Sequence, residues 1–410
     1  MNNVLIVLDH ETRIPPFMVT LLLYAENRYN KVFYINTRKP QNYDLFEKTG
    51  VNIVYPSKWI KVWCAFLALI RFISIENIKQ WFKCIKDKGF DLGYVRQLYI
   101  CLGADIQLKT MARKILKENE NVLVTVLAAW FAAAALAGAE LKKQHPRIKA
   151  VSLAHSYEIL TLRNPFIPYL YVEKKHKYLD GVYFICNTVR EMYLEGVGGL
   201  PEYYLKKTHV NYLGSFKDHH GVNTIKPEEF HICTCSRMVP LKRLDVLLDA
   251  LSLWDDGDIY WTHLGDGELE TKIRADAEKV MASNPLVHIH FTGYVKNELV
   301  QQYYVEHPID LFINLSSTEG LPISIMEAIS YGLPVMATDV GGTSEIINDK
   351  FGFLIDSKIN PEYIKSQIQA FKSLPEEKRV EMRKNAYQHW SECFDANKNM
   401  QSLFNAINSI

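Results

Sequence analysis

Short apolar runs alternate with longer helical stretches through the first half of the chain. The runs are apolar at nearly every position rather than at every second one, which is typical of parallel strands covered by helices on both faces. Strands are expected at 4–8, 32–35, 122–126, 150–153 and 182–185. Helices are expected between them, including 95–119 and the alanine-rich stretch 131–143. This alternation predicts a doubly wound α/β sheet.

The same rhythm starts again after a polar, irregular stretch at 214–227. A second set of strands is expected at 232–235, 259–264, 288–292, 311–315 and 334–337. Further helices are expected at 243–253, 268–282, 296–304, 323–331, 361–373 and 376–410. A single hydrophobic core stops growing at roughly 250–300 residues. The chain has 410 residues, so two domains are expected.

Two Rossmann-like domains facing a central cleft are the expected architecture. Residues 1–213 are assigned to the first domain, 214–385 to the second, and 386–410 to a terminal helix that returns to the first. In open parallel sheets, ligands bind where the strands end. Functional residues are therefore expected in the loops that directly follow strands.

Charge is distributed unevenly between the two halves. Residues 1–213 hold 29 Lys and Arg against 18 Asp and Glu, whereas the remainder holds 18 against 28. The basic half suits an anionic lipid or a phosphorylated acceptor. Ordinary solvation of both surfaces is the alternative. No nucleic-acid partner is expected.

The cysteines and the N-terminus bear on the compartment. Seven cysteines occur without a CxxC pair, which favours a reducing compartment. No signal peptide is recognised, because Met1 is followed almost at once by the first expected strand. The expected location is cytoplasmic, including the inner face of the cell membrane.

The segment 59–73 is very apolar and contains two basic residues. It is too short to cross a bilayer, which takes roughly 20 apolar residues. It is interpreted either as a buried helix or as a helix inserted into a membrane surface. Lys79, Lys83 and Lys86 follow at helical spacing and support the second interpretation. Both interpretations stay open.

Two cations follow the first strand of the second half. Ser236, Arg237 and Lys242 lie on a strand-to-helix loop. A guanidinium can donate two parallel hydrogen bonds to two oxygens of one phosphate, and an ammonium adds a compact positive charge. The N-terminus of a helix adds backbone N–H donors. The loop is therefore a candidate anion site. A solvated surface pair is the alternative.

Glycine-containing turns follow the next two strands. Gly265 and Gly267 flank Asp266, and glycine permits close approach of the backbone to a ligand. Gly293 and Tyr294 follow the next strand, where their backbone can meet a nucleotide base. Simple turns at the ends of strands are the alternative at both places.

Two glutamates eight residues apart give the sharpest signal. Glu319 follows the strand 311–315, and residues 320–322 lead into a helix that carries Glu327 on its side. Both carboxylates can accept hydrogen bonds from the hydroxyls of one elongated ligand, with helix N–H groups holding a phosphate between them. A glutamate that merely stabilises the helix dipole is the alternative. It does not account for the whole string 316–334.

Taken together, these residues resemble the family 4 glycosyltransferases, which are retaining enzymes of the GT-B fold, here of the bacterial surface-polysaccharide type. The resemblance is specific across about residues 230–356. It is carried by Ser236-Arg237 with Lys242, Gly265 to Gly267, Gly293-Tyr294, the pair Glu319 and Glu327, and the string 334–345. In the first half it is limited to 154–158, which contains His155.

The resemblance implies a role for each matching residue. Arg237 and Lys242 would hold the donor diphosphate, and Glu327 would hold the ribose hydroxyls. Tyr294 would meet the base through its backbone. The catalytic residues implied are His155, Glu319, Arg237 and Lys242, with His155 and Glu319 facing the donor sugar. The other donor-binding residues implied are Ser236, Gly265, Tyr294, Gly320, Leu321, Pro322, Ile323 and Glu327.

The loop after the first strand departs from the family. The family often has glycines there, whereas residues 9–17 contain none and include Pro15 and Pro16. Consecutive prolines stiffen the backbone and remove N–H donors. Backbone contacts from this loop to the donor are therefore not expected, and Arg13 is the candidate substitute.

The charge of a leaving diphosphate would be stabilised by the two cations and the helix amides. No Asp-x-Asp sequence directly follows a strand, so neither a metal nor another cofactor is expected, as the resemblance also implies. Same-face attack is the expected route to retention. A covalent glycosyl-enzyme, with Glu319 as the candidate nucleophile, is the alternative.

The predicted activity is transfer of a sugar from a nucleotide diphosphate sugar to a saccharide or lipid-linked glycan acceptor. Peripheral contact with an anionic membrane would accompany it. A nucleotide-sugar epimerase of the same fold and a non-catalytic scaffold subunit are the alternatives. The string around Glu319 and Glu327 disfavours the epimerase, and the intact set of site residues disfavours the scaffold.

Overall fold

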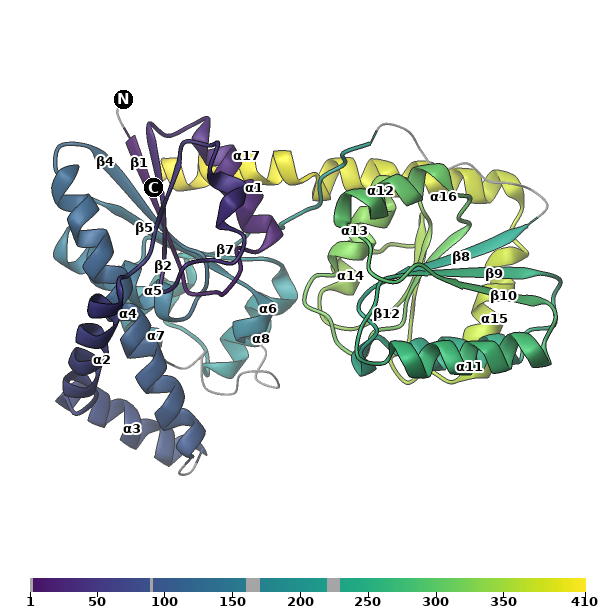
Figure 1. Cartoon of the computed structure of the whole chain (residues 1–410), viewed down its shortest axis with the longest axis horizontal. Coiled ribbons are helices and arrows are strands. Elements are labelled where there is room, and N and C mark those ends of the chain that lie inside the picture. Colours follow the sequence, from purple (N-terminus) through teal and green to yellow (C-terminus); the bar gives the residue numbers. More distant parts are fainter. Residues whose placement is uncertain (1–2, 89–90, 160–169, 220–228) are drawn as a thin grey trace. The chain divides into compact units, whose positions relative to one another are not determined.

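The computed structural model describes residues 3–88, 91–159, 170–219 and 229–410 (Figure 1). The chain forms two compact units. Unit 1 comprises Met1–Asn211 together with Met400–Ile410, and unit 2 comprises Tyr212–Asn399. The division falls two residues before the expected boundary, and the segment that rejoins unit 1 is shorter than the expected 386–410.

Among the described residues, unit 1 has a parallel sheet of seven strands in the order β3-β2-β1-β4-β5-β6-β7. The strands are β1 (Asn3–Asp9), β2 (Lys31–Asn36), β3 (Val51–Val54), β4 (Leu123–Ala128), β5 (Lys149–Ala154), β6 (Gly181–Phe184) and β7 (Thr208–Val210). The sequence predicts the five inner strands and misses β3 and β7. These two edge strands are short and only partly buried, so they lack a continuous apolar run.

Helices cover both faces of this sheet. Leu5 and Val7 pack in one buried cluster with residues of α1 and α17, whereas Ile6 pairs in register with Val126, which approaches Gly138 of α5. Both faces of β1 are thus in the core, which explains its unbroken apolar run. The helices of unit 1 are α1 (Pro16–Glu26), α2 (Lys58–Phe72), α3 (Ile75–Lys88), α4 (Leu92–Glu118), α5 (Ala133–Gln144), α6 (Ser156–Ile159), α7 (Val172–Tyr178), α8 (Asn187–Gly196), α9 (Glu202–Leu205) and the end of α17 (Ala396–Ser409).

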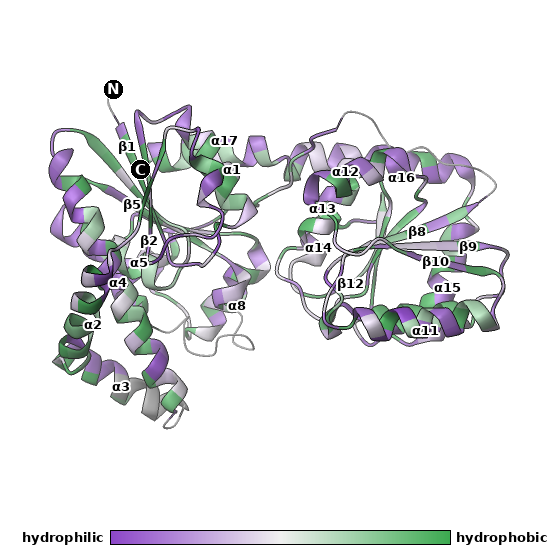
Figure 2. Ribbon diagram, in the orientation of Figure 1, coloured by the Kyte–Doolittle hydropathy of each residue, from purple (hydrophilic) through white to green (hydrophobic). Residues whose placement is uncertain are grey.

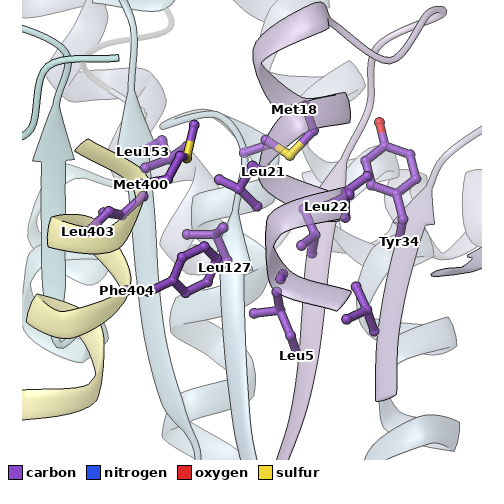
Figure 3. Packing of buried hydrophobic residues seen from close by; sticks show 14 of the residues in the cluster. Leu5, Met18, Leu21, Leu22, Tyr34, Leu127, Leu153, Met400, Leu403 and Phe404 are labelled. Atoms are coloured by element: carbon purple, nitrogen blue, oxygen red, sulfur yellow. The ribbon is translucent and has the colours of Figure 1, made fainter. Parts of the chain in front are cut away.

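The end of the chain completes the core of unit 1 (Figure 3). Met400, Leu403, Phe404 and Ile407 of α17 are buried together against strands β1, β4 and β5 and helix α1. Their spacing of three and four residues places all four on one face of the helix. The last eleven residues are therefore part of the first folding unit.

Among the described residues, unit 2 has a parallel sheet of six strands in the order β10-β9-β8-β11-β12-β13. The strands are β8 (Phe230–Cys235), β9 (Ile259–Leu264), β10 (Val287–Phe291), β11 (Leu311–Asn314), β12 (Val335–Thr338) and β13 (Gly352–Ile355). The edge strand β13 was not predicted. The helices are α10 (Leu244–Ser252), α11 (Glu270–Ser283), α12 (Asn297–Glu306), α13 (Ile323–Ser330), α14 (Thr343–Ile346), α15 (Pro361–Lys372) and α16 (Glu376–His389).

The predicted helix 376–410 is wrong as a single element. A π-helical turn at Trp390–Phe394 separates α16 from α17. Asp395 then leaves the helical conformation, and its carboxylate accepts a hydrogen bond from the amide of Asn397 at 2.9 Å. An aspartate that bonds the first amides of a helix favours a new start at that point. The apolar pattern continues across this interruption, which is why the sequence conceals it.

Helix α2 is an exposed element with a hydrophobic sequence (Figure 2). Strands such as β1 and β5 are hydrophobic and buried, whereas α2 is hydrophobic although much of its surface is exposed. Within the described parts of the chain, no helix combines the length and the hydropathy needed to cross a bilayer. The cysteines that the structure describes are all free thiols.

Candidate active site

The predicted donor residues of unit 2 lie at one edge of its sheet. Strands β10, β9, β8 and β11 are neighbours in that order, and the loop after each strand carries part of the predicted set. Because all four strands are parallel, these loops emerge at the same edge. Residues that are up to 77 positions apart in the sequence are thus brought into adjacent loops, as the pairings below show.

Backbone hydrogen bonds join these loops to one another. The Ser236 amide donates to the Leu264 carbonyl at 3.1 Å, and the Gly265 amide donates to the Gly293 carbonyl at 3.0 Å. The Ser317 amide donates to the Leu241 carbonyl at 2.8 Å. Bonds between loops fix each loop by its neighbours, so the edge of the sheet presents a preorganised surface.

Glycines allow the loops to approach this closely. Gly265 has φ 134°, and a Cβ there would lie 2.0 Å from the carbonyl oxygen of Ser236. Gly341 has φ 58°, and a Cβ there would lie 1.9 Å from the carbonyl oxygen of Glu319. Both positions combine a left-handed backbone with a close approach that excludes any side chain. Gly341 therefore supports Glu319, a contribution that the sequence pattern alone did not identify.

Lys242 and Glu319 form an ion pair at the centre of the site. Lys242 ends a 3₁₀ turn, Pro240–Lys242, that precedes α10, and its Nζ lies 2.5 Å from Oε1 of Glu319. The two side chains are 20% and 12% exposed. The Asn314 amide group also donates to this oxygen, at 3.4 Å. The structure thus brings together a cation and a carboxylate that are 77 residues apart.

The neighbouring arginines differ in how they are used. Arg237 is exposed. Arg243 has a left-handed backbone, φ 51°, and its guanidinium donates to the carbonyls of Leu315 and Ser316 at 2.6 and 2.8 Å. Arg243 thereby fixes the loop after β11, which carries Glu319. Sequence reasoning missed this role, because a side chain that bonds backbone carbonyls leaves no spacing signal.

Residues 320–322 lead from Glu319 into α13 and are buried. The Gly320 carbonyl accepts a hydrogen bond from the Gly342 amide at 2.7 Å. Pro322 is the N-cap of α13 and provides no side-chain hydrogen bond. Since the first amides of a helix have no partner within the helix, those of Ile323 and Ser324 can bind an anion. Ile323 is exposed at this end of the helix.

Glu327 lies one turn further along α13 and is buried. Burial, together with the nearby charge of Asp218, raises the pKa of its carboxyl to about 7 in spite of a hydrogen bond with Asn297, which lowers it. A carboxylate with such a pKa is poorly solvated in the free protein. It is therefore suited to accept hydrogen bonds from hydroxyl groups of a ligand.

Tyr294 follows β10 with its side chain largely exposed. The backbone at the preceding Gly293 is left-handed, with φ 69°, and its carbonyl is already bonded to the Gly265 amide. This hydrogen bond places Tyr294 next to the loop after β9. Among the described residues, no three His, Cys, Asp or Glu side chains are grouped as a metal site would require.

His155 lies in unit 1 at the end of β5 and is buried. Its ring is 4.5 Å from that of Phe17 and 4.7 Å from that of Trp130, and its Nε2 lies 3.2 Å from the Ala129 carbonyl. This carbonyl can only accept, so Nε2 carries the proton and Nδ1 is an acceptor. Burial lowers the pKa of His155 to about 4, which keeps the ring neutral.

The loop after β1 is organised by Asp9 rather than by glycine. The buried Asp9 carboxylate accepts from the Glu11 amide and from Trp130 Nε1, both at 2.9 Å, and from the Tyr34 hydroxyl at 2.5 Å. Sequence reasoning missed this cluster, although an Asp at the end of an apolar strand was a visible signal. Arg13 is exposed on the same loop.

Comparison with known proteins assigns this arrangement to a family. Residues 215–389 match the sequence model of the family described as Glycosyl transferases group 1. The glycosyltransferase MJ1178 of Methanocaldococcus jannaschii is 32% identical over 130 residues, which are 32% of this chain and 34% of that protein. The O-antigen biosynthesis glycosyltransferase WbnH of Escherichia coli is 32% identical over 133 residues, 32% of this chain and 35% of WbnH. The chain thus matches about a third of the length of these relatives.

Solved structures extend the likeness to the whole chain at the level of the fold. HepE of Anabaena in complex with UDP has a TM-score of 0.69 and 15% identity, with 100% of both chains covered. The lipopolysaccharide outer core galactosyltransferase WaaB has a TM-score of 0.65 and 14% identity, with 99% of both chains covered. Residues 215–389 therefore form a glycosyl transferase group 1 domain, in a chain that has the GT-B fold of solved glycosyltransferases.

Proposed function

We propose that the chain transfers a sugar, with retention of configuration, from a nucleoside diphosphate sugar to a saccharide or lipid-linked glycan in surface-polysaccharide synthesis. The observation that carries the proposal is the Lys242–Glu319 ion pair beside the open N-terminus of α13, with Glu327 one turn further along. The relative WbnH is described as an enzyme of O-antigen biosynthesis, and HepE was solved with UDP. Both support a nucleotide-sugar donor and a glycan product.

The diphosphate would lie between the two glutamates. Arg237 and Lys242 supply positive charge, and the first amides of α13 supply N–H donors. Glu327 accepts from the ribose hydroxyls, and Glu319 accepts from hydroxyls of the donor sugar. Because the two cations and the helix amides neutralise the leaving diphosphate, we propose a reaction without a divalent metal or other cofactor.

Retention would follow from attack on the same face as the departing phosphate. The bond between the anomeric carbon and the phosphate oxygen breaks, the bond to the acceptor oxygen forms, and the acceptor proton passes to the leaving phosphate. We assign Glu319 to sugar binding because it is already paired with Lys242, which weakens it as a nucleophile. His155, neutral and with Nδ1 free to accept by its tautomer, would bind a sugar hydroxyl.

The reaction is proposed to take place in the cytoplasm, at the inner face of the cell membrane, with peripheral contact to anionic lipid. Three observations support this location. The chain has free thiols at its described cysteines, residues 1–213 carry an excess of positive charge, and α2 exposes a row of large apolar side chains. Lys79 is exposed, whereas the side chains of Lys83 and Lys86 lie outside the described ones.

A screen of nucleotide sugars by thermal shift tests the donor, since a ligand that binds only the folded state raises its stability. With the best donor, free nucleoside diphosphate should appear only when an acceptor is added, and the new glycosidic bond should have the donor's anomeric configuration. Nucleotide release without acceptor, or conversion of the donor to its epimer, would overturn the transfer. A product of opposite configuration would overturn retention alone.

Lys242→Ala tests the diphosphate contact. The change should lower kcat/KM by more than tenfold, because the leaving group loses a positive charge, while thermal unfolding stays cooperative. Lys296→Ala, at the N-cap of α12, is the matched control for loss of an exposed lysine in unit 2. A decrease below about threefold in the Lys242 variant, or roughly 0.7 kcal/mol, would contradict the assignment.

A further inference from the structure

Helix α2 leaves most of its apolar surface uncovered. Only Cys64 and Ala68 are buried along its length, so the interpretation of this segment as a buried helix is wrong. The exposed side chains of this segment are large and apolar: Trp59, Val62, Trp63, Phe66, Leu69, Ile70 and Ile73. Soluble proteins seldom expose so many large apolar side chains together without a partner for them.

A groove lies between α2 and α4, with a volume of about 450 Å³. Lys61 and Ala65 line it from α2, and Ile100, Gly103 and Gln107 line it from α4. A Cβ added at Gly103 would meet no atom within 4 Å, so the space beside this residue is open. Because Ala65 and Gly103 have little side-chain volume, they leave this groove open between the two helices.

The groove is continuous with the exposed apolar face. Lys61, Ala65 and Leu69 are spaced by four residues and form one row along α2. Lys61 and Ala65 line the groove, whereas Leu69, one turn further, is 57% exposed. An extended hydrocarbon chain can therefore run from Ala65 in the groove to Leu69 on the apolar face.

Polar groups lie at the other end of the groove. Arg38 follows β2 and lines the groove together with Lys61, and both side chains are exposed. Arg38 donates to the Thr12 hydroxyl at 3.3 Å, which uses one of its five N–H groups. Asp105, the acidic residue of α4 nearest in sequence to Gly103, is engaged by Lys109 at 2.7 Å. Neither Arg38 nor Lys61 has an ion pair with another described residue, so both cations can balance an external negative charge.

Gln107 adds a further polar group. Its Oε1 is buried and has no hydrogen-bond partner among the described residues, although the side chain lines the groove. A buried polar oxygen without a partner is uncommon and costs free energy.

We infer that the α2–α4 groove binds an anionic amphiphile, with its phosphate held by Arg38 and Lys61 and its hydrocarbon chain lying along Ala65, Gly103 and Leu69. The groove opens beside the carboxyl end of β2, the edge of the sheet at which ligands bind in this class of fold. The inference rests on the proposed function for its meaning, since a lipid phosphate is the natural anchor of a lipid-linked glycan acceptor. The same chemistry is also present in a bilayer phospholipid.

Calorimetry with octyl phosphate and decyl phosphate, below their micelle concentrations, tests the site on the full chain. Decyl phosphate should bind about tenfold more tightly than octyl phosphate, because two further methylenes are buried. Inorganic phosphate and neutral octanol should each bind at least tenfold more weakly than octyl phosphate. Equal affinity for inorganic phosphate would overturn the inference, because the groove would then be a simple anion site.

Gly103→Leu fills the groove and should weaken decyl phosphate at least tenfold. Lys114→Leu, an exposed position on the same helix, is the matched control. The double change Arg38→Gln and Lys61→Gln should remove the preference for decyl phosphate over octanol, whereas Lys114→Gln with Lys117→Gln should not. The inference would be overturned if the Gly103 variant bound decyl phosphate with an affinity within twofold of that of the unchanged protein. It would also be overturned if the unchanged protein were a dimer and the Gly103 variant a monomer, because a second copy of the chain would then cover the groove.

Flotation with vesicles of phosphatidylglycerol and phosphatidylcholine separates the two sources of lipid phosphate. If Gly103→Leu loses both flotation with the vesicles and binding of decyl phosphate, the groove is assigned to bilayer lipid. Unchanged flotation with loss of decyl phosphate binding assigns it to the carrier lipid of an acceptor. Donor binding is measured separately in unit 2, so a chain that binds decyl phosphate but no nucleotide sugar would overturn the proposed function and leave this inference standing.

Discussion

At the scale of single residues, the Lys242–Glu319 pair explains how the site stays stable before a donor arrives. Each charge neutralises the other across 2.5 Å, and the Asn314 amide adds a further hydrogen bond to the carboxylate. An incoming donor can give its phosphate to the ammonium and its hydroxyls to the carboxylate. Under the proposed function, Lys242 and Glu319 would exchange each other for the donor, so that neither charge is left unpaired.

Under the proposed function, Glu327 should make donor binding depend on pH. Burial raises its pKa to about 7, with Asp218 adding to the rise and Asn297 opposing it; Cys235 and Tyr304 also lie close enough to interact, and burial keeps both neutral. The ionised form accepts ribose hydroxyls more strongly, so affinity for a nucleotide sugar should increase as pH rises from 6 to 8. Calorimetry should show a gain of roughly threefold to tenfold.

Glu327→Gln is the control for this pH dependence, because glutamine still accepts one hydrogen bond but does not titrate. Its affinity for a nucleotide sugar should be lower at pH 8 and nearly constant between pH 6 and 8. The ligand used in this experiment is a nucleotide sugar. A free nucleoside diphosphate is unsuitable, because its terminal phosphate titrates near this pH range and would add its own pH dependence. An equally steep pH profile in the variant would assign the titration to another group.

At the scale of elements, the loops of unit 2 depend on glycines that face backbone rather than ligand. Gly341→Ala should displace the carbonyl of Glu319, lower affinity for a nucleotide sugar at least tenfold and destabilise the protein by more than the cost of a left-handed alanine, which is about 1–2 kcal/mol. Calorimetry and denaturant unfolding measure the two effects. The close contact with Glu319 is the reason for both.

Gly198→Ala is the matched control for this change. Gly198 has φ 73°, and a Cβ there would meet nothing within 4 Å. This variant therefore bears the backbone cost without the clash and should keep its donor affinity. Similar losses of donor affinity in both variants would show that backbone strain, rather than displacement of Glu319, is responsible.

A buried ion network fixes α2 to the rest of unit 1. Arg71 of α2 binds both Asp105 of α4 and Glu140 of α5, and Lys109 binds the same two carboxylates. Arg71→Met should destabilise the protein by about 2–4 kcal/mol in denaturant unfolding, because two carboxylates then share fewer cations. The exposed pair on α9 is the control, and Lys206→Met should change stability by less than about 0.5 kcal/mol.

At the scale of the whole molecule, the sequence predicted the inner strands of both sheets from their apolar runs. It predicted site residues from their positions in the loops that follow strands. The inner strands of both sheets were expected because both of their faces are buried, and the edge strands β3, β7 and β13 were not. Lys242 and Glu319 were both predicted as site residues from their places in loops after strands, but their ion pair was not, because it depends on which strands are neighbours. Contacts with backbone carbonyls were not predicted. The Arg243 guanidinium donates to the carbonyls of Leu315 and Ser316, and Gly341 lies against the carbonyl of Glu319, and both contacts depend on dihedral angles that no residue pattern specifies.

The return of the chain to unit 1 couples the folding of that unit to its last residues. Leu403→Ala should destabilise unit 1 by about 2–5 kcal/mol, because Leu403 is fully packed among Leu127, Leu153 and neighbouring core side chains. Hydrogen exchange should then accelerate in the amides of β1 and β4, while the amides of β8 in unit 2 stay protected. Asn405→Ala, on the exposed side of α17, should change neither.

The amides of β8 decide whether this effect is local. Residues 212–399 form a unit with their own sheet, so a cavity at Leu403 should leave donor binding in unit 2 within twofold of the unchanged chain. Acceleration of exchange in β8 equal to that in β1 would show that the two units unfold as one. In that case the terminal helix would stabilise the whole molecule rather than complete a single core.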